Sequence, residues 1–294
     1  MISLSLGGLR VDVVLTPEAG AHDSGAHGAG TQSDRAALQV LVDSFGPFVV
    51  DAATCPVPDE EVVAMRLSVD PTLVLPDVGP VPAEGLCYQR TDLRFEMGPR
   101  RRTARAAVDG SRGALEAAVE LCVQGALLRR GGLVVHAVAG VDADGRAWLV
   151  PGRSGAGKST IARTAGFSRV LADEAVILRR EAPGRFRLYG TPFWSEGRTL
   201  PLQTGHAPLG VLARPLKASE AAAERYSTAS AAADLLACVM FHDADPAARG
   251  LVLETACDVA ASVDCVQLQF PKEGPWLNGV VQRRAEWARS STAR

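Results

Sequence analysis

The sequence predicts an α/β fold with a mixed sheet, in which a glycine-rich loop joins a strand to a helix. Three observations lead to this prediction. Short β-like runs separated by Pro and Gly fill residues 47–96, as in a small antiparallel sheet. Residues 113–130 carry apolar side chains at helical spacing. An apolar run over 146–151 leads into a glycine-rich segment, residues 152–160, and a second helical stretch follows it.

The N-terminal part of the chain predicts a β-rich region. In residues 2–15 apolar and polar side chains alternate loosely, and the segment ends in a run rich in β-branched residues. This pattern predicts a strand or a hairpin. Residues 17–34 are small, polar and Gly-rich, which predicts a flexible loop. The basic run over 97–106 is interpreted as a solvated linker, with a docking surface for an acidic peptide as the alternative.

The later elements follow from turn chemistry and periodicity. The Asp-Ala-Asp-Gly turn at 142–145 joins two apolar runs, so the sequence predicts a β-hairpin over 133–151. Beyond the glycine-rich segment, the pattern predicts a helix over 158–166 and one buried strand over 169–180. The remaining predicted elements are a strand followed by a loop within 185–194, a strand over 208–216, an Ala-rich helix or helix pair over 218–242, a helix over 250–262, and a last strand over 264–271.

Composition and charge narrow the class of protein. The 294 residues are 47% hydrophobic and 22% charged, as in an ordinary globular protein. Lys and Arg total 31 against 33 Asp and Glu, which gives no electrostatic reason to expect nucleic acid or an anionic membrane as a partner. The six cysteines have no zinc-type spacing, and no apolar run reaches the roughly 18 residues of a membrane helix. With no signal-peptide pattern at residue 1, we expect a cytoplasmic protein.

The strongest motif is G-R-S-G-A-G-K-S-T, which matches G-x-x-x-x-G-K-[ST] without a mismatch. Its glycines let backbone N–H groups converge on phosphate oxygens without Cβ clashes. Lys158 can reach the β- and γ-phosphates, and the Ser159 hydroxyl can bind Mg²⁺. A strand precedes the motif and a helix follows it, as phosphate binding requires. The sequence therefore predicts a nucleotide-binding loop made of Gly152, Arg153, Ser154, Gly155, Ala156, Gly157, Lys158, Ser159 and Thr160.

Two acids follow at the end of the next apolar run. Asp173 lies 15 residues after Lys158, and Glu174 is next. After a short helix we expect this strand to return beside the loop strand, which brings both carboxylates close to Mg²⁺ and the γ-phosphate. Acids there can hold metal or accept a proton from an attacking hydroxyl. A solvent-facing strand end is the alternative.

Other classes of NTPase that have such a glycine-rich loop fit this sequence less well. No LSGGQ-like run follows the loop, which disfavours an ABC ATPase, and no N/T-K-x-D motif follows, which disfavours a GTPase. In the usual doubly wound NTPase the loop follows the first strand of a parallel sheet. Here the loop strand is the second arm of a hairpin.

These features together resemble a known family. The stretch VVHAVAGVDADGRAWLVPGRSGAGKSTIARTAGFSRVLADEAVIL is similar to the catalytic core of the HPr serine kinase/phosphorylase family, which has a His, a glycine-rich loop and an acidic pair in this order. It also resembles the shorter HPr-kinase-like proteins encoded beside ribosomal-peptide maturation genes. The match covers residues 133–178, and the first hundred residues carry no matching motif. The resemblance implies a P-loop kinase core of the HPr kinase and phosphoenolpyruvate carboxykinase type.

The resemblance also implies roles for individual residues. His136 matches the hairpin His, which would orient or charge-balance the phosphate site, although a lone His on an apolar strand is otherwise a core residue. Asp173 matches the base for the incoming hydroxyl. Glu174 stands where the family has a second Asp, and Thr160 where it usually has Glu. Arg153 replaces a residue that is often acidic. These departures disfavour phosphorylase activity and HPr itself as the substrate.

A further candidate is the loop over 190–198, in which Pro and two Gly residues flank aromatic side chains. One interpretation is a substrate or nucleotide lid, with Glu196 and Arg198 facing the phosphates. An Arg there could stabilise the transferring charge. A packed turn between strands is the alternative.

The sequence thus predicts an ATP- and Mg²⁺-dependent kinase that phosphorylates a hydroxyl, expected to be a serine, of a peptide or small protein. Its catalytic residues would be Asp173, His136, Lys158 and Arg198, and its metal ligands Ser159, Asp173 and Glu174. A nucleotide-binding regulatory or scaffold protein with little turnover, and a small-molecule kinase, are the alternatives. The predicted division is a β-rich region over 1–110 that recognises substrate, a catalytic domain over 111–288, and a frayed tail over 289–294. The resemblance also suggests a homo-oligomer.

Overall fold

The computed structural model describes residues 1–16, 32–193 and 204–283, so the predicted tail and most of the loop predicted at 17–34 lie outside it. The chain divides into two units. The first contains Met1–Arg130 and Phe241–Leu251, and the second contains Gly131–Met240 and Val252–Arg294. The first unit thus extends twenty residues beyond the predicted boundary at residue 110. No helix in the described part of the chain is both long and apolar enough to cross a membrane.

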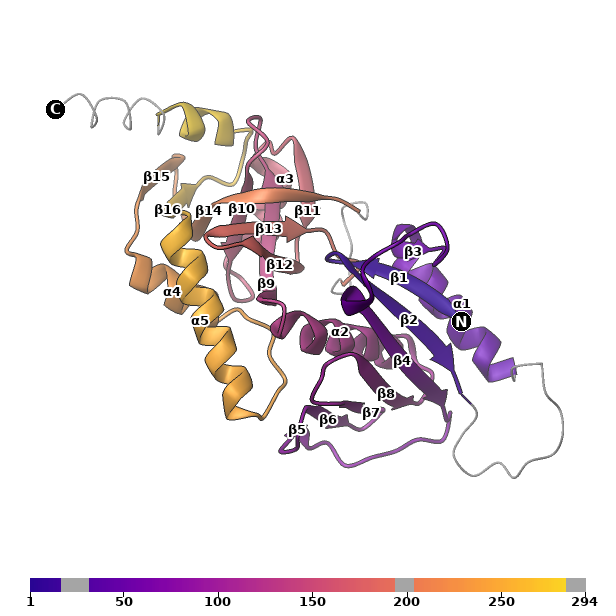
Figure 1. Ribbon diagram of the computed structural model, residues 1–294. Coiled ribbons are helices and arrows are strands. Elements are labelled where there is room, and N and C mark those ends of the chain that lie inside the picture. The colour runs from indigo at the N-terminus through magenta and orange to yellow at the C-terminus, as the bar shows by residue number, and fades with distance from the viewer. Residues whose placement is uncertain (17–31, 194–203, 284–294) are drawn as a thin grey trace, which may run out of the picture. The chain divides into compact units, whose positions relative to one another are not determined.

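The first unit contains an eight-stranded mixed sheet (Figure 1). Its strand order is β3-β1-β2-β4-β8-β7-β6-β5, in which the β2–β4 and β4–β8 pairs are parallel. The predicted antiparallel sheet is therefore larger than expected and partly parallel. The strands are β1 (Ile2–Leu6), β2 (Leu9–Leu15), β3 (Val49–Val50), β4 (Val62–Val69), β5 (Gly79–Val81), β6 (Leu86–Arg90), β7 (Leu93–Met97) and β8 (Thr103–Val108).

Two helices pack against this sheet and against each other. The predicted helix is confirmed as α2 (Arg112–Leu128), and the Ser111 hydroxyl caps it by accepting from the Ala114 amide. The other helix, α1 (Gln32–Phe45), was not predicted and begins within the expected loop. Its buried residues Ala37, Leu41 and Phe45 recur every four positions, which is a helical spacing. Two short 3₁₀ turns, Gly46–Phe48 and Asp59–Glu61, complete the first unit before α2.

The basic run over 97–106 is not a solvated linker. Arg101 is 2% exposed and lies between β7 and β8 with a φ of 57°. Its guanidinium forms a buried ion pair with Asp243, which belongs to the segment Phe241–Leu251 of the same unit. A buried ion pair is sensitive to the loss of either partner, because the remaining charge would be left desolvated. The pair therefore ties this late segment to the N-terminal sheet.

A second polar contact holds the same segment to α2. The His242 ring and the Gln124 side-chain carbonyl are 2.9 Å apart, and the Gln124 amide donates to Glu120 at 2.9 Å. Burial raises the pKa of Glu120 to about 7. A carboxyl with a raised pKa favours folding only while it is protonated. The stability that Glu120 contributes is therefore complete below its unfolded pKa near 4.5 and is lost as the pH rises through about 7.

We expect the Glu120→Gln variant to be more stable than the wild type at pH 8 and equally stable at pH 4.5. The full shift corresponds to about 3 kcal/mol, and residual solvent contact of this partly exposed side chain reduces the expected gain to about 2 kcal/mol. Urea unfolding followed by far-UV circular dichroism at both pH values measures it. The exposed Glu84→Gln variant serves as the control. An unchanged pH dependence in Glu120→Gln would contradict the prediction.

The second unit is built around a second mixed sheet with the order β10-β9-β12-β13-β14-β16-β15. β14 also pairs with β10, so the strands β10, β9, β12, β13 and β14 form a closed ring. β11 lies outside this ring and pairs with β9. The strands are β9 (Gly132–Val141), β10 (Ala147–Pro151), β11 (Arg169–Ala172), β12 (Ala175–Ala182), β13 (Arg185–Tyr189), β14 (His206–Lys217), β15 (Ala222–Arg225) and β16 (Asp264–Phe270). The helices are α3 (Lys158–Thr164), α4 (Thr228–Leu236) and α5 (Pro246–Ser262), of which α5 begins in the first unit.

The predicted hairpin of β9 and β10 is confirmed. The buried Asp142 organises its turn, because one carboxylate oxygen accepts from the Asp144 and Arg146 amides. The other oxygen accepts from the Trp148 indole at 2.9 Å. The turn is thereby fixed to the strand that leads into the glycine-rich loop.

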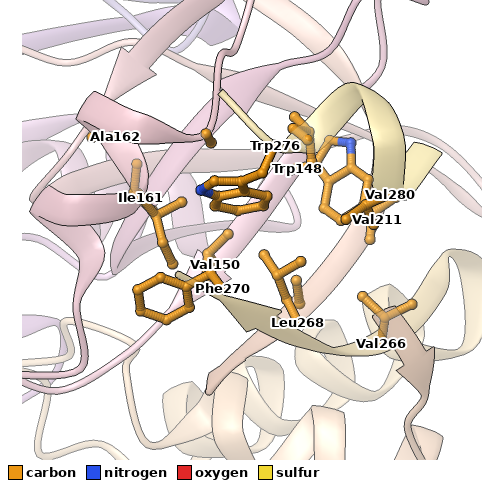
Figure 2. Packing of buried hydrophobic residues seen from close by; sticks show 14 residues of the cluster. Trp148, Val150, Ile161, Ala162, Val211, Val266, Leu268, Phe270, Trp276 and Val280 are labelled. Carbon is orange, nitrogen blue, oxygen red and sulfur yellow. The ribbon is translucent and has the colours of Figure 1, made fainter. Parts of the chain in front are cut away.

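A hydrophobic cluster lies between α3 and the sheet (Figure 2). Ile161 and Ala162 of α3 pack over side chains from four strands, Val138 of β9 among them, and from the segment after β16. The strand side chains of this cluster include Trp148 and Val150 of β10, Val211 and Ala213 of β14, and Val266, Leu268 and Phe270 of β16. These positions alternate along each strand and so lie on one face of the sheet. Burial of this face holds α3, and with it the loop, against β10, β14 and β16.

One prediction for the second unit is wrong, and a second is right only in part, because 218–242 contains the helix α4 but not a helix throughout. The single strand over 169–180 is two strands, β11 and β12, interrupted at Asp173 and Glu174. The Ala-rich stretch over 218–242 contains the short strand β15 before α4. Ala-rich residues 222–225 pair with β16, so the neighbouring strand overrides their helix propensity.

Candidate functional site

The central element of the candidate site is β9. β10 pairs with residues 137–141 along one edge, and β11 and β12 pair in succession along the other. His136 sits at the junction: its carbonyl accepts from the Gly152 amide, and its pairing partner on β12 is Ala175. The Ala137 amide donates to the Glu174 carbonyl at 3.0 Å. The start of the glycine-rich loop and the acid pair therefore lie on opposite edges of β9 at the same level.

The returning strand is thus next to β9 and not, as expected, next to the loop strand β10. The physical reason is that the two edges of β10 are taken by β9 and by β14. The strand after α3 consequently pairs one position further along the sheet. The acid pair occupies the break between β11 and β12, where the strand pairing is irregular. The two side chains therefore need not alternate between the two faces of the sheet, as side chains in a regular strand do.

The glycine-rich loop has the backbone that its sequence requires. Gly155 and Gly157 have φ values of 81° and 100°, a region that side chains with a Cβ rarely adopt. A Cβ on Gly157 would lie 2.4 Å from the Phe270 ring, whereas a Cβ on Gly155 would meet nothing within 4 Å. The Ala156 amide donates to the Arg153 carbonyl at 3.1 Å and bends the loop. The loop is therefore closed on the sheet side and open above Gly155.

Lys158 is buried at the first position of α3, and its ammonium donates to the Gly152 carbonyl at 2.8 Å. Burial lowers the pKa of Lys158, and the negative charges of Glu174 and Asp173 act in the opposite direction. The lysine thus lies within electrostatic reach of both acids. The ammonium also donates to the Arg153 carbonyl at 3.5 Å. An ammonium has three donors, so these two contacts to the loop leave one donor for anionic oxygens.

The acid pair contains two carboxylates in different surroundings. Asp173 is 8% exposed, and burial, followed by the charge of Glu174, raises its pKa. Glu174 lies 3.0 Å from the His136 Nε2 atom. Burial, with the charge of Lys158, lowers the pKa of His136, so the neutral ring donates from Nε2 to the carboxylate. His136 therefore positions Glu174, and Asp173 has the elevated proton affinity of a candidate base.

Cys238 also lies at this site, although the sequence did not predict a role there. The residues after α4 pair with β9 below the point where β10 ends, through a bridge between Val135 and Val239. The Cys238 carbonyl accepts from the His136 amide at 2.7 Å. The His136 carbonyl in turn accepts from the Gly152 amide, so Cys238 lies near the start of the loop. Burial raises the pKa of its thiol, and the charge of Lys158 acts in the opposite direction. Only strand pairing reveals this proximity, because Cys238 is 80 residues from Lys158 and has no motif around it.

The other predicted site residues are placed as follows. Arg153, Ser154 and Ser159 are exposed, while Ala156 and Thr160 are partly buried. The Thr160 carbonyl accepts from the Thr164 hydroxyl within α3. Arg198 and Glu196 lie outside the described residues. The structure therefore brings together the loop, Lys158, His136 and the acid pair, and it neither supports nor opposes a role for Arg198.

The described residues contain no cluster of three or more His, Cys, Asp or Glu side chains suited to a metal ion. The predicted metal ligands are two carboxylates and the Ser159 hydroxyl. Mg²⁺ is commonly held by one or two carboxylates together with phosphate oxygens and waters, and not by a protein cage. The available donors fit that kind of binding.

Comparisons with known proteins do not identify a family for this chain. A scan against protein-family models finds no match. A search of curated proteins likewise finds no significant match.

Proposed function

We propose that the chain is a Mg²⁺- and ATP-dependent kinase that transfers the γ-phosphoryl group to a hydroxyl, most simply the serine of a peptide or small protein. One observation carries the proposal: β9 holds a glycine-rich loop on one edge and an acid pair on the other, within electrostatic reach of the same lysine. The resemblance of residues 133–178 to the HPr kinase core agrees with it. This geometry combines anion binding with a base.

The loop supports the nucleotide half of the proposal. Its backbone is open above Gly155, and its glycines at positive φ allow N–H groups to turn toward an anion. Lys158 would bind the β- and γ-phosphates, with its ammonium already held at the loop by Gly152. Ser159 and Glu174 would hold Mg²⁺, which neutralises phosphate charge when it is bound.

Asp173 supplies the acid–base half. Its raised pKa makes it a better proton acceptor than an ordinary Asp, and beside Glu174 it would face the phosphates of a nucleotide bound at the loop. In the proposed step, Asp173 takes the proton of the acceptor hydroxyl. The hydroxyl oxygen forms a bond to the γ-phosphorus, the bond from that phosphorus to the β–γ bridging oxygen breaks, and ADP leaves. Positioning and charge stabilisation provide most of the acceleration.

A mass-resolved phosphotransfer assay tests the function. The wild type is incubated with Mg²⁺, γ-labelled ATP and the serine-containing peptides encoded beside its gene, each paired with a Ser→Ala version. We expect one peptide to gain a phosphate that its Ser→Ala version does not. We expect Lys158→Ala to lower the transfer at least about 100-fold, because it removes a charge that stabilises the transferring group. The exposed Arg185→Ala variant should retain full transfer.

The assay also separates the alternatives. ATP binding without ADP formation or transfer to any peptide would contradict the kinase proposal and favour a nucleotide-binding regulatory protein. Formation of ADP only in the presence of a small hydroxyl compound would identify a metabolite as the acceptor. Undiminished transfer by Lys158→Ala would remove the loop from the mechanism.

A further inference from the structure

The overhanging end of β14 presents a second cation beside the loop. β14 runs parallel to β10, and the register pairs Leu149 with Leu212. β10 ends at Pro151, whereas β14 continues to Lys217. The last residues of β14 therefore extend beyond β10 in the direction in which the loop leaves it.

Alternation along β14 determines which face Lys217 occupies. Val211 and Ala213 belong to the hydrophobic cluster beneath α3. Figure 2 shows Val211 in this cluster. Residues 215 and 217 continue that row, because side chains two positions apart in a strand share a face. Pro215 confirms the direction, since its Cγ atom would lie 3.5 Å from a Cβ on Gly152. Lys217 is the next member of this row and is exposed.

Lys217 is also next to the other end of the loop. Its partner on the parallel strand β16 is Phe270, whose ring packs against Gly157, the residue before Lys158. Pro215, two residues before Lys217, lies beside Gly152 at the start of the loop. Phe270, the strand partner of Lys217, lies beside Gly157 near its end. The lysine is thus next to both ends of the loop. Within the described residues its ammonium has no hydrogen bond or ion pair.

We propose that Lys217 is a second nucleotide-binding cation, which contacts the α- and β-phosphates of the bound nucleotide. The inference rests on the proposed function and extends it. Asp173 and Glu174 lie beyond β9, and Lys217 lies on β14, so the strand that leads into the loop runs between them. A nucleotide whose γ-phosphate faces the acids directs its α-phosphate and nucleoside toward β14. Lys217 would therefore bind ATP and ADP alike.

Nucleotide affinity, measured by titration calorimetry with Mg²⁺ and ATP or ADP, tests the assignment without requiring turnover. We expect Lys217→Gln to weaken both nucleotides about tenfold, as for the loss of one charge-assisted hydrogen bond. Lys217→Arg should recover most of the affinity. The control is Arg146→Gln, which removes one exposed positive charge at the opposite end of β10.

Each result bears on the assignment. Wild-type affinity in Lys217→Gln would overturn it, and so would an equal loss in Arg146→Gln, which would indicate a general effect of net charge. Weakening of ATP alone would place Lys217 at the γ-phosphate and would contradict the proposed direction of the nucleotide. A wild type that binds neither nucleotide would instead refute the proposed function, so the two failures are distinguishable.

Discussion

Replacing Asp173 by Asn is expected to lower kcat for phosphotransfer about 1000-fold while leaving the affinity for ATP within about twofold. The substitution keeps the size of the side chain and removes the proton acceptor. Because the wild-type carboxyl is buried beside Glu174, which raises its pKa, its loss also relieves repulsion between two acids. We therefore expect the folded state to be no less stable. Single-turnover transfer and equilibrium ATP binding, measured on the same preparation, check both parts.

The matched control for this change is Asp144→Asn. Asp144 is exposed in the hairpin turn at the far end of β9, so its substitution removes an equal charge from the same strand pair. It should retain full transfer. An Asp173→Asn variant that transfers phosphate at the wild-type rate would exclude Asp173 as the base. Loss of ATP binding in that variant would instead assign Asp173 to the nucleotide or its metal ion.

Gly157→Ala is expected to cause the largest loss of stability among single changes in the loop. Both the φ of 100° and the Phe270 ring, which would lie 2.4 Å from an added Cβ, oppose a side chain at this residue. The backbone strain costs about 1–2 kcal/mol, and overpacking against a buried ring adds about 1–3 kcal/mol. Chemical unfolding followed by the fluorescence of Trp148 and Trp276, which pack in the same cluster, measures the change.

Gly155→Ala provides the comparison, because it has a similar φ of 81° and open space around the added methyl group. We expect it to lose only the strain contribution. A double-mutant cycle with Phe270→Leu isolates the clash: the smaller side chain should reduce the cost of Gly157→Ala, which makes the two changes non-additive. Equal losses in the two glycine variants, or strict additivity with Phe270→Leu, would contradict a clash with the ring.

Much of the fold was predictable where the signal is local. The spacing of apolar residues predicted α2, and the Asp-Ala-Asp-Gly turn predicted the hairpin of β9 and β10. Helix α1 was missed, although its buried residues have helical spacing, because its first residues continue a small, polar segment. The stretch over 218–242 has the composition of a helix because alanine favours helices in isolation, whereas pairing with β16 makes residues 222–225 a strand.

The candidate site likewise has residues that a local pattern predicts and residues that it does not. The spacing of glycines, Lys158 and Ser159 identifies the loop, because a phosphate-binding turn is made by consecutive residues whose backbone conformation their own side chains restrict. The acids were also visible as a pair at a strand end. Cys238 and Lys217 were not, because each comes close to the loop only through a neighbouring strand.

The sequence by itself determined the glycine-rich loop, the hairpin that carries it, and the residues available for acid–base chemistry. Only the tertiary structure decided that the acid pair lies across β9, that His136 holds Glu174, and that β14 passes beside the loop. Loop conformation depends on interactions over a few residues. The order of strands in a sheet depends instead on which apolar faces can be buried together by segments far apart in the chain, and no local pattern specifies that choice.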